Sequence, residues 1–180
     1  MLGASQAGTR LRYQATPGIS LIARLSTAIR RTSASEAALG IEWQLARDIP
    51  LRLLAERRQA LGREGRSAFA ATLHGGVSER PLPLSFRLDA YAQAGAVGLR
   101  SRDLFAEGTA RIGLPIGSRG SVGAAAWGAA QPAVRRLDLG PSASLRLPTL
   151  GATLSADWRF RVAGNARPGS GPALTLWTDF

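Results

Sequence analysis

The residues of this chain that could do chemistry are mostly arginines. All 23 basic residues are arginine, against 12 Asp plus Glu, which gives a formal net charge of +11 at pH 7. Many of them recur at alternate positions among acidic residues, as Arg159 and Arg161 do after Asp157. In an extended strand, residues at this spacing share one face. The candidate arginines for such a polar face are Arg12, Arg24, Arg52, Arg87, Arg111, Arg136, Arg146, Arg159 and Arg161.

Other kinds of chemistry find few suitable residues. Cysteine is absent and His74 is the only histidine, so a metal site would have to use carboxylates alone. No Gly-x-Ser-x-Gly motif is present, and the glycine-rich segment 117–123 lacks the lysine of a phosphate-binding loop. Asp103, Glu107 and Arg111 fit a ladder of alternating charges along a strand better than an acid–base pair. We therefore expect no enzymatic activity, no metal and no cofactor.

Apolar and polar residues alternate along most of the chain, which is typical of strands whose two faces meet different environments. In residues 150–163, for example, Trp158 and Phe160 alternate with Asp157 and Arg159. A helix would scatter these charges around its surface. The pattern predicts about eleven strands, at residues 8–15, 18–30, 36–47, 50–58, 66–77, 83–95, 103–116, 119–130, 134–148, 150–163 and 171–180.

The predicted strands are long for a soluble β-protein. Many exceed the roughly 5 or 6 residues of an ordinary strand and match the about 9 to 11 residues with which a tilted strand crosses a bilayer. Predicted tight turns, such as Gly117–Ser118 and Pro148–Thr149, tend to alternate with longer connections such as Gly164–Ser170, as in outer-membrane barrels. No apolar run approaches the roughly 20 residues of a membrane helix. The sequence therefore predicts an all-β protein, one antiparallel up-and-down transmembrane β-barrel over residues 1–180, located in the bacterial outer membrane.

The last predicted strand carries a further signal. Leu174, Leu176 and Phe180 occupy alternate positions at the end of the chain, with Thr178 as a weaker match between them. This arrangement resembles the signal that the outer-membrane assembly machinery reads, so that machinery is an expected partner.

The start of the sequence and the strand count point to a missing portion. Residues 1–5 lack the basic start and the apolar core of a signal peptide. A closed single-chain barrel needs an even number of strands, and about eleven is odd. We expect at least one strand and an export signal upstream; a miscounted segment, such as 50–58 or 119–130, is the alternative.

Inside such a barrel the polar face would line the lumen. The acidic residues interleaved with the arginines there are Glu42, Glu56, Asp89, Glu107, Asp138 and Asp157. If the lumen is open, its excess of arginine favours anionic solutes. The equally weighted alternative is a narrow lumen filled by mutually neutralising pairs. A GC-rich genome explains the use of arginine in place of lysine equally well.

Three segments carry a resemblance to known proteins: Pro50–Arg58, Leu88–Gly95 and Leu104–Gly113. The chain from about Ser35 onward resembles the C-terminal barrels of envelope proteins that carry tetratricopeptide repeats in front. These are the bacteriophage adsorption protein A family and the cellulose synthase type of exopolysaccharide exporter. No 34-residue helical repeat occurs in this chain. The resemblance implies an export channel for polysaccharide or a surface receptor.

The sequence thus predicts a porin-like channel or export pore for anionic solutes or exopolysaccharide. Expected partners are outer-membrane lipid, lipopolysaccharide and anionic polysaccharide. One alternative is a barrel that serves only as a surface anchor or receptor. Another is a soluble basic β-protein that binds nucleic acid, which would need aromatic residues interleaved with arginine for base stacking. Aromatic residues are 6% of the chain and the arginines alternate with small or aliphatic ones, so nucleic acid is not expected.

Overall fold

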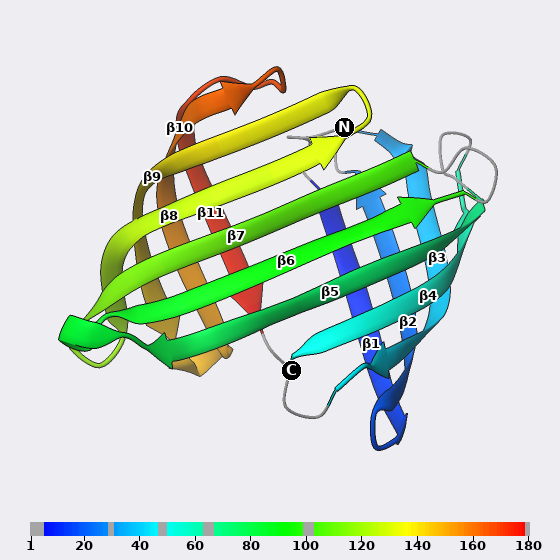
Figure 1. Ribbon diagram of the computed structural model, residues 1–180, viewed down its shortest axis with the longest axis horizontal. Coiled ribbons are helices and arrows are strands. Elements are labelled where there is room, and N and C mark those ends of the chain that lie inside the picture. The colour runs from blue at the N-terminus through cyan, green and yellow to red at the C-terminus, as the bar shows by residue number, and fades with distance from the viewer. Residues whose placement is uncertain (1–5, 29–30, 47–49, 63–66, 99–102, 179–180) are drawn as a thin grey trace. The chain divides into compact units, whose positions relative to one another are not determined.

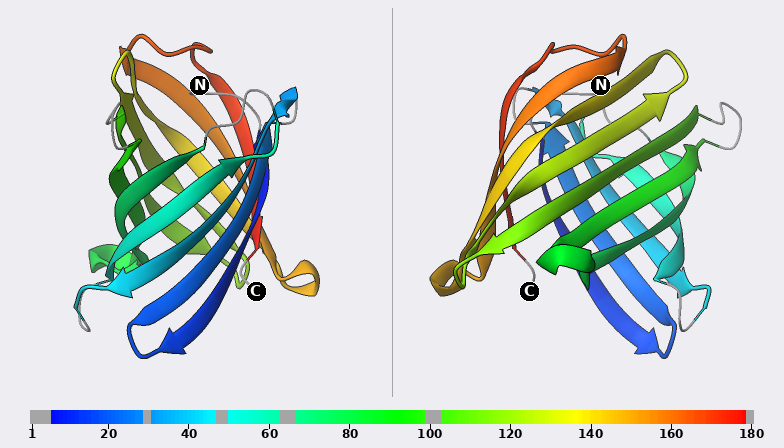
Figure 2. Two further views of the ribbon diagram at one scale, coloured as in Figure 1. Left: turned by 90° about the vertical axis from the view of Figure 1, so that its right-hand side faces the viewer. Right: turned by 60° about the vertical axis from the view of Figure 1, so that its left-hand side comes forward.

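A computed structural model describes residues 6–28, 31–46, 50–62, 67–98 and 103–178. Within these residues, eleven strands form one antiparallel sheet in which each strand pairs with its neighbours in chain order. Figure 1 shows consecutive strands side by side, as β7, β8 and β9 do, and Figure 2 shows the same for β1 to β4, coloured blue to cyan. The strands are β1 (Gln6–Thr16), β2 (Ile19–Ala28), β3 (Arg31–Gln44), β4 (Leu51–Ala60), β5 (Ala68–Pro81), β6 (Arg87–Val97), β7 (Asp103–Ile116), β8 (Gly120–Gln131), β9 (Val134–Leu147), β10 (Ala152–Gly164) and β11 (Gly171–Thr178).

Each predicted strand corresponds to an observed one, and the predicted all-β, antiparallel, up-and-down order is confirmed. The largest differences lie at three ends. β3 begins at Arg31 and β5 continues to Pro81, both inside segments predicted to be loops. β6 begins at Arg87, because the segment before it forms a 3-10 turn, η1 (Pro83–Ser85), in which Leu84 has φ 59°. Pro83 has no amide hydrogen to donate to a strand ladder, so alternation alone did not make this segment a strand.

The alternation of short and long connections holds only in part. Residues 117–119 and 17–18 form short turns and residues 165–170 a longer one, as predicted. Residues 132–133, however, form one of the shortest turns on the side predicted to carry longer loops. The predicted tight turn at Asp48–Ile49 lies outside the described residues.

The strands belong to two compact units. Unit 1 comprises residues 1–75 and 93–106, and unit 2 comprises residues 76–92 and 107–180. Strands β1 to β4 lie in unit 1 and β8 to β11 in unit 2, while β5, β6 and β7 contribute a portion to each. Each unit is described below by itself.

In both units the usual pattern of burial is inverted. Large apolar side chains are exposed: Leu11 at 67%, Leu39 at 69% and Leu104 at 64%. Acidic and hydroxyl side chains are buried: Glu42 and Asp138 at 1% each. The alternation of side chains across a strand produces this pattern, because one face of nearly every strand is polar and the other apolar.

Unit 1 also holds a small apolar cluster and one outward-facing charge. Ala68, Ala70 and Val97 form a buried cluster, with Phe105 packed against it. Arg57, near the end of β4, is exposed and lies over the ring of Phe69 at 4.7 Å from its centroid. A cation–π contact of this kind keeps the guanidinium beside an aromatic face while its outer side meets solvent.

The described sheet is open. β1 and β11 stand at the two ends of the strand order, so each has one neighbour among the described strands. The predicted closure into a barrel is therefore not present in the described residues, since the outer edges of these two strands have no partner strand there. Within the same residues, no helix is long and apolar enough to span a membrane.

Candidate functional site

The candidate site is the polar face, where carboxylates are buried among arginines. In unit 1 it centres on Glu42 of β3, which lies opposite Ser20 of β2 and Leu54 of β4. The strand alternation sends the flanking Ile41 and Trp43 to the other face, where they are 53% and 56% exposed. Glu42 is consequently the one residue of the three that is buried.

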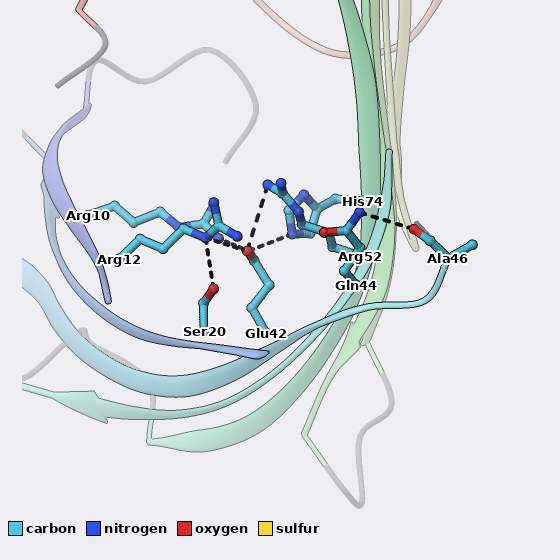
Figure 3. Close-up of polar contacts among 8 residues, drawn as sticks. All are labelled: Arg10, Arg12, Ser20, Glu42, Gln44, Ala46, Arg52 and His74. Atoms are coloured by element: carbon cyan, nitrogen blue, oxygen red, sulfur yellow. Dashed lines mark hydrogen bonds and ion pairs between the residues drawn. The ribbon is translucent and has the colours of Figure 1, made fainter. Parts of the chain in front are cut away.

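Four nitrogen-bearing side chains from three other strands converge on the Glu42 carboxylate (Figure 3). Arg12 Nε lies 3.1 Å and Arg52 Nη1 3.9 Å from Oε1, and His74 Nε2 lies 3.0 Å from Oε2, which Arg10 also contacts. Arg12 Nε also donates to Ser20 Oγ at 3.1 Å. We call Glu42, Arg10, Arg12, Arg52 and His74 the Glu42 cluster. It places three guanidinium groups around one buried carboxylate, so its balance of formal charge is positive.

A second buried carboxylate in unit 1 follows the same pattern. Glu56 of β4 is 4% exposed, and its Oε1 accepts hydrogen bonds from Arg24 Nη2 at 2.9 Å and Arg58 Nε at 2.6 Å. Gly40, its neighbour on β3, leaves room for it, because a Cβ there would be 2.9 Å from the Glu56 Cβ. This pair of arginines again exceeds the charge of the carboxylate that they contact.

In unit 2 the corresponding centre is Asp157 of β10. Arg111 Nη2 lies 3.1 and 3.3 Å from its two oxygens and Arg159 Nη2 lies 3.7 Å away. Arg111 Nε also donates to Ser142 Oγ at 2.6 Å, which ties β7 to β9 on this face. Arg159 lies over the buried ring of Trp127, 4.5 Å from its centroid.

Two further arginines of unit 2 hold the connection between β10 and β11. Arg136 Nε donates to Asp138 Oδ2 at 2.6 Å, and its terminal nitrogens donate to the carbonyls of Pro168 and Gly169 at 2.6 and 3.1 Å. Arg161 Nη1 donates to the Ala166 carbonyl at 2.7 Å. These arginines use part of their donor capacity on backbone, which fixes the connection rather than adding charge to a pore.

An exposed carboxylate, Glu79 of β5, pairs with the remaining predicted arginines of unit 2. Arg87 Nη1 lies 2.8 Å from its Oε2, and Arg146 contacts its Oε1. Asp89 accepts hydrogen bonds from Ser78 Oγ at 2.8 Å and from the Glu79 N–H at 2.9 Å. Unlike Glu42 and Glu56, Glu79 is 45% exposed, so its ion pairs face solvent.

The predicted arginines therefore fall into separate clusters, each around its own carboxylate. Arg24 and Arg52 belong to unit 1, and the other predicted arginines apart from Arg12 belong to unit 2. Of the predicted acidic partners, Glu107 has an exposed side chain on β7. In the described part of the chain, no group of three His, Cys, Asp or Glu residues is placed to hold a metal ion. Leu174 and Leu176 are exposed at 77% and 61%, and Phe180 lies outside the described residues.

Sequence reasoning missed several participants. Arg10 precedes Arg12 by two positions and Arg58 follows Glu56 by two, so the alternation already placed both on the polar face. Glu79 was missed because it fell in a segment predicted to be a loop. Trp127 gave no signal of its position, because the Ala-rich stretch around it has no alternation.

The charge of the clusters determines what they can do. Glu42, Glu56 and Asp157 each contact more than one arginine, so these groups attract anions rather than cations. Neutralising pairs account for part of the arginine charge and leave an excess.

Comparison with known proteins gives no matching family model, no matching curated protein and no matching solved structure. The likeness to the barrels of repeat-bearing envelope proteins therefore stays a prediction.

Proposed function

We propose that this chain is a bacterial outer-membrane β-barrel protein that acts as a channel or export pore for anionic solutes or anionic polysaccharide, without catalysis. The observation that carries the proposal is the inverted burial of the two strand faces. Leu11, Leu39 and Leu104 are exposed, while Glu42 and Asp138 are buried.

Lipid is the environment that this distribution fits. A soluble monomer seldom exposes apolar side chains on strand after strand, because a large apolar surface in water drives association. A membrane barrel presents apolar residues to lipid and polar residues to its interior, with strict alternation along each strand. The arginine of the outward face, Arg57, lies near a strand end, where a long basic side chain can reach the polar interface.

Insertion also requires that strand edges be paired. A backbone N–H or C=O without a partner is costly in hydrocarbon, and a closed barrel is the form of sheet that avoids such edges. We expect the outer edges of β1 and β11, which have no partner strand in the described residues, to be paired in the membrane-inserted protein.

The choice of anions rests on the charge of the polar face. Three arginines surround Glu42 and two contact Glu56, so the excess charge in unit 1 is positive. Rings or clusters of arginine in a pore select anions, as carboxylate rings select cations.

The proposal is tested on the full chain, refolded into detergent micelles and run on a denaturing gel with and without boiling. A band that shifts on boiling, and a cofractionation with outer membranes in expressing cells, are the expected results. Conductance across a planar bilayer under a salt gradient should then show a reversal potential of the sign given by anions.

The other outcomes assign different functions. A heat-shifted protein without conductance would favour a surface anchor or receptor. A water-soluble protein without a heat shift, whose binding to nucleic acid falls steeply with salt, would overturn the membrane proposal in favour of a basic nucleic-acid-binding protein.

A further inference from the structure

Unit 2 contains a cavity of about 1000 Å³ at the end of the sheet where the connections 117–119 and 148–151 lie. Portions of β5 to β10 form its walls. Its charged and aromatic lining consists of Glu79, Arg87, Asp89, Tyr91, Arg111, Arg119 and Arg146. A volume of this size is at the upper end of the range for pockets that hold small organic ligands.

The cavity contains a two-arginine clamp that is occupied by a carboxylate of the chain itself. Arg87 and Arg146, on β6 and β9, both contact the side chain of Glu79. The exposed fractions of these side chains are 51%, 58% and 45%, whereas Glu42 in its cluster is 1% exposed. An ion pair this exposed is weak, because water and salt compete with it. Glu79 is therefore a carboxylate that another anion can replace.

The backbone around Glu79 is held independently of its carboxylate. Asp89 Oδ1 accepts hydrogen bonds from Ser78 Oγ at 2.8 Å and from the Glu79 N–H at 2.9 Å. Glu79 has φ 49°, in the left-handed region that a non-glycine residue seldom adopts. The side chain can thus leave the clamp while the backbone stays in place.

Two more arginines extend the positive surface beyond the clamp. The Arg119 carbonyl accepts a hydrogen bond from the Arg146 N–H at 2.8 Å, which places the turn bearing Arg119 beside the clamp. Arg111 lines the same cavity from β7. Four arginines and two carboxylates, Glu79 and Asp89, therefore line it, so the cavity carries an excess of positive charge.

We propose that this cavity binds a solute carrying two or more oxyanionic groups, either carboxylate or phosphate. One group displaces Glu79 and is held by the guanidinium groups of Arg87 and Arg146, whose planar donors match both kinds of oxyanion. A second group meets Arg111 and Arg119. The inference rests on the proposed function, in which the cavity becomes a recruiting vestibule at one mouth of the pore.

The test is calorimetric titration of the full chain in detergent micelles at low salt. The probes are citrate, tripolyphosphate and the neutral sugar maltotriose. We expect one or both anions to bind, and the anion that binds identifies the oxyanion class. Arg146→Gln should weaken binding at least about tenfold, since it removes one charged arm of the clamp. Glu79→Gln should strengthen binding several-fold, because the competing carboxylate is gone.

Arg80→Gln is the matched control, because Arg80 is the exposed neighbour of Glu79 and does not line the cavity. It removes the same charge and should leave the affinity within about twofold. Binding of maltotriose as tight as that of the anions, or an equal loss in Arg80→Gln and Arg146→Gln, would overturn the inference. The same samples are tested for the heat shift. A heat-shifted protein that binds neither anion removes the cavity site alone, whereas a missing heat shift removes the pore proposal and leaves the titration to decide the site.

Discussion

At the scale of single residues, the buried carboxylates are the costliest groups in the molecule and the best compensated. Glu42 and Asp138 are each 1% exposed, and both contact at least one guanidinium. Removing an ion from water is expensive unless opposite charges and hydrogen bonds replace its hydration. Three arginines and His74 perform that role for Glu42, and they come from strands on both sides of it.

Glu42→Gln should therefore destabilise the protein. The amide keeps the shape of the side chain but leaves Arg10, Arg12 and Arg52 without a carboxylate. Breaking a buried pair costs about 3–5 kcal/mol, and we expect the lower end because these arginines are 35–40% exposed. Chemical unfolding in detergent or lipid measures the change in the free energy of unfolding.

Glu79→Gln serves as the control for that change. Its ion pairs with Arg87 and Arg146 are exposed, so it should alter the free energy of unfolding by at most about 1 kcal/mol. Equal effects of the two substitutions would mean that burial of Glu42 is not what makes its charge important.

At the scale of elements, close approach between neighbouring strands depends on glycine. A Cβ at Gly140 of β9 would lie 1.7 Å from the Trp158 carbonyl oxygen of β10. A Cβ at Gly123 of β8 would lie 1.9 Å from the Ile112 carbonyl oxygen of β7. No side chain fits at such distances, so a substitution there must separate the strands locally.

Gly140→Ala is expected to lower the free energy of unfolding by about 2 kcal/mol or more, since the added methyl meets backbone that cannot rotate away. Gly128→Ala on β8 is the matched control, because the nearest atom to its Cβ is Leu137 Cδ1 at 3.9 Å. That control should change the free energy by less than about 0.5 kcal/mol. If both variants unfold alike, the close approach of β9 and β10 is not what limits stability.

At the scale of the whole molecule, the proposed lipid environment predicts how outward residues tolerate charge. Leu139 lies near the middle of β9, 46% exposed, between Ala126 of β8 and Phe160 of β10. Leu150 is 67% exposed in the turn η2 (Pro148–Leu150) that joins β9 to β10. Both are exposed leucines, and they differ in the depth at which a bilayer would meet them.

Leu139→Arg should cost about 2–4 kcal/mol in lipid vesicles, whereas Leu150→Arg should cost about 0–1 kcal/mol, because the penalty for arginine is largest at the membrane centre. Denaturant titration of the vesicle-inserted protein measures both. Small effects at both positions would indicate that this face meets water.

The sequence by itself determined the eleven strands, their antiparallel order and the residues that share a face. These are local properties, because side chains alternate along any strand with a period of two. Only the tertiary structure decided which charges meet. Arg111 contacts Asp157, 46 positions away, and Arg146 contacts Glu79, 67 positions away. Such partners depend on strand register and on how long side chains reach across several strands, and neither is encoded in the spacing of residues along one strand. The turn at Leu84 and the cavity beside Glu79 depended likewise on contacts between distant segments.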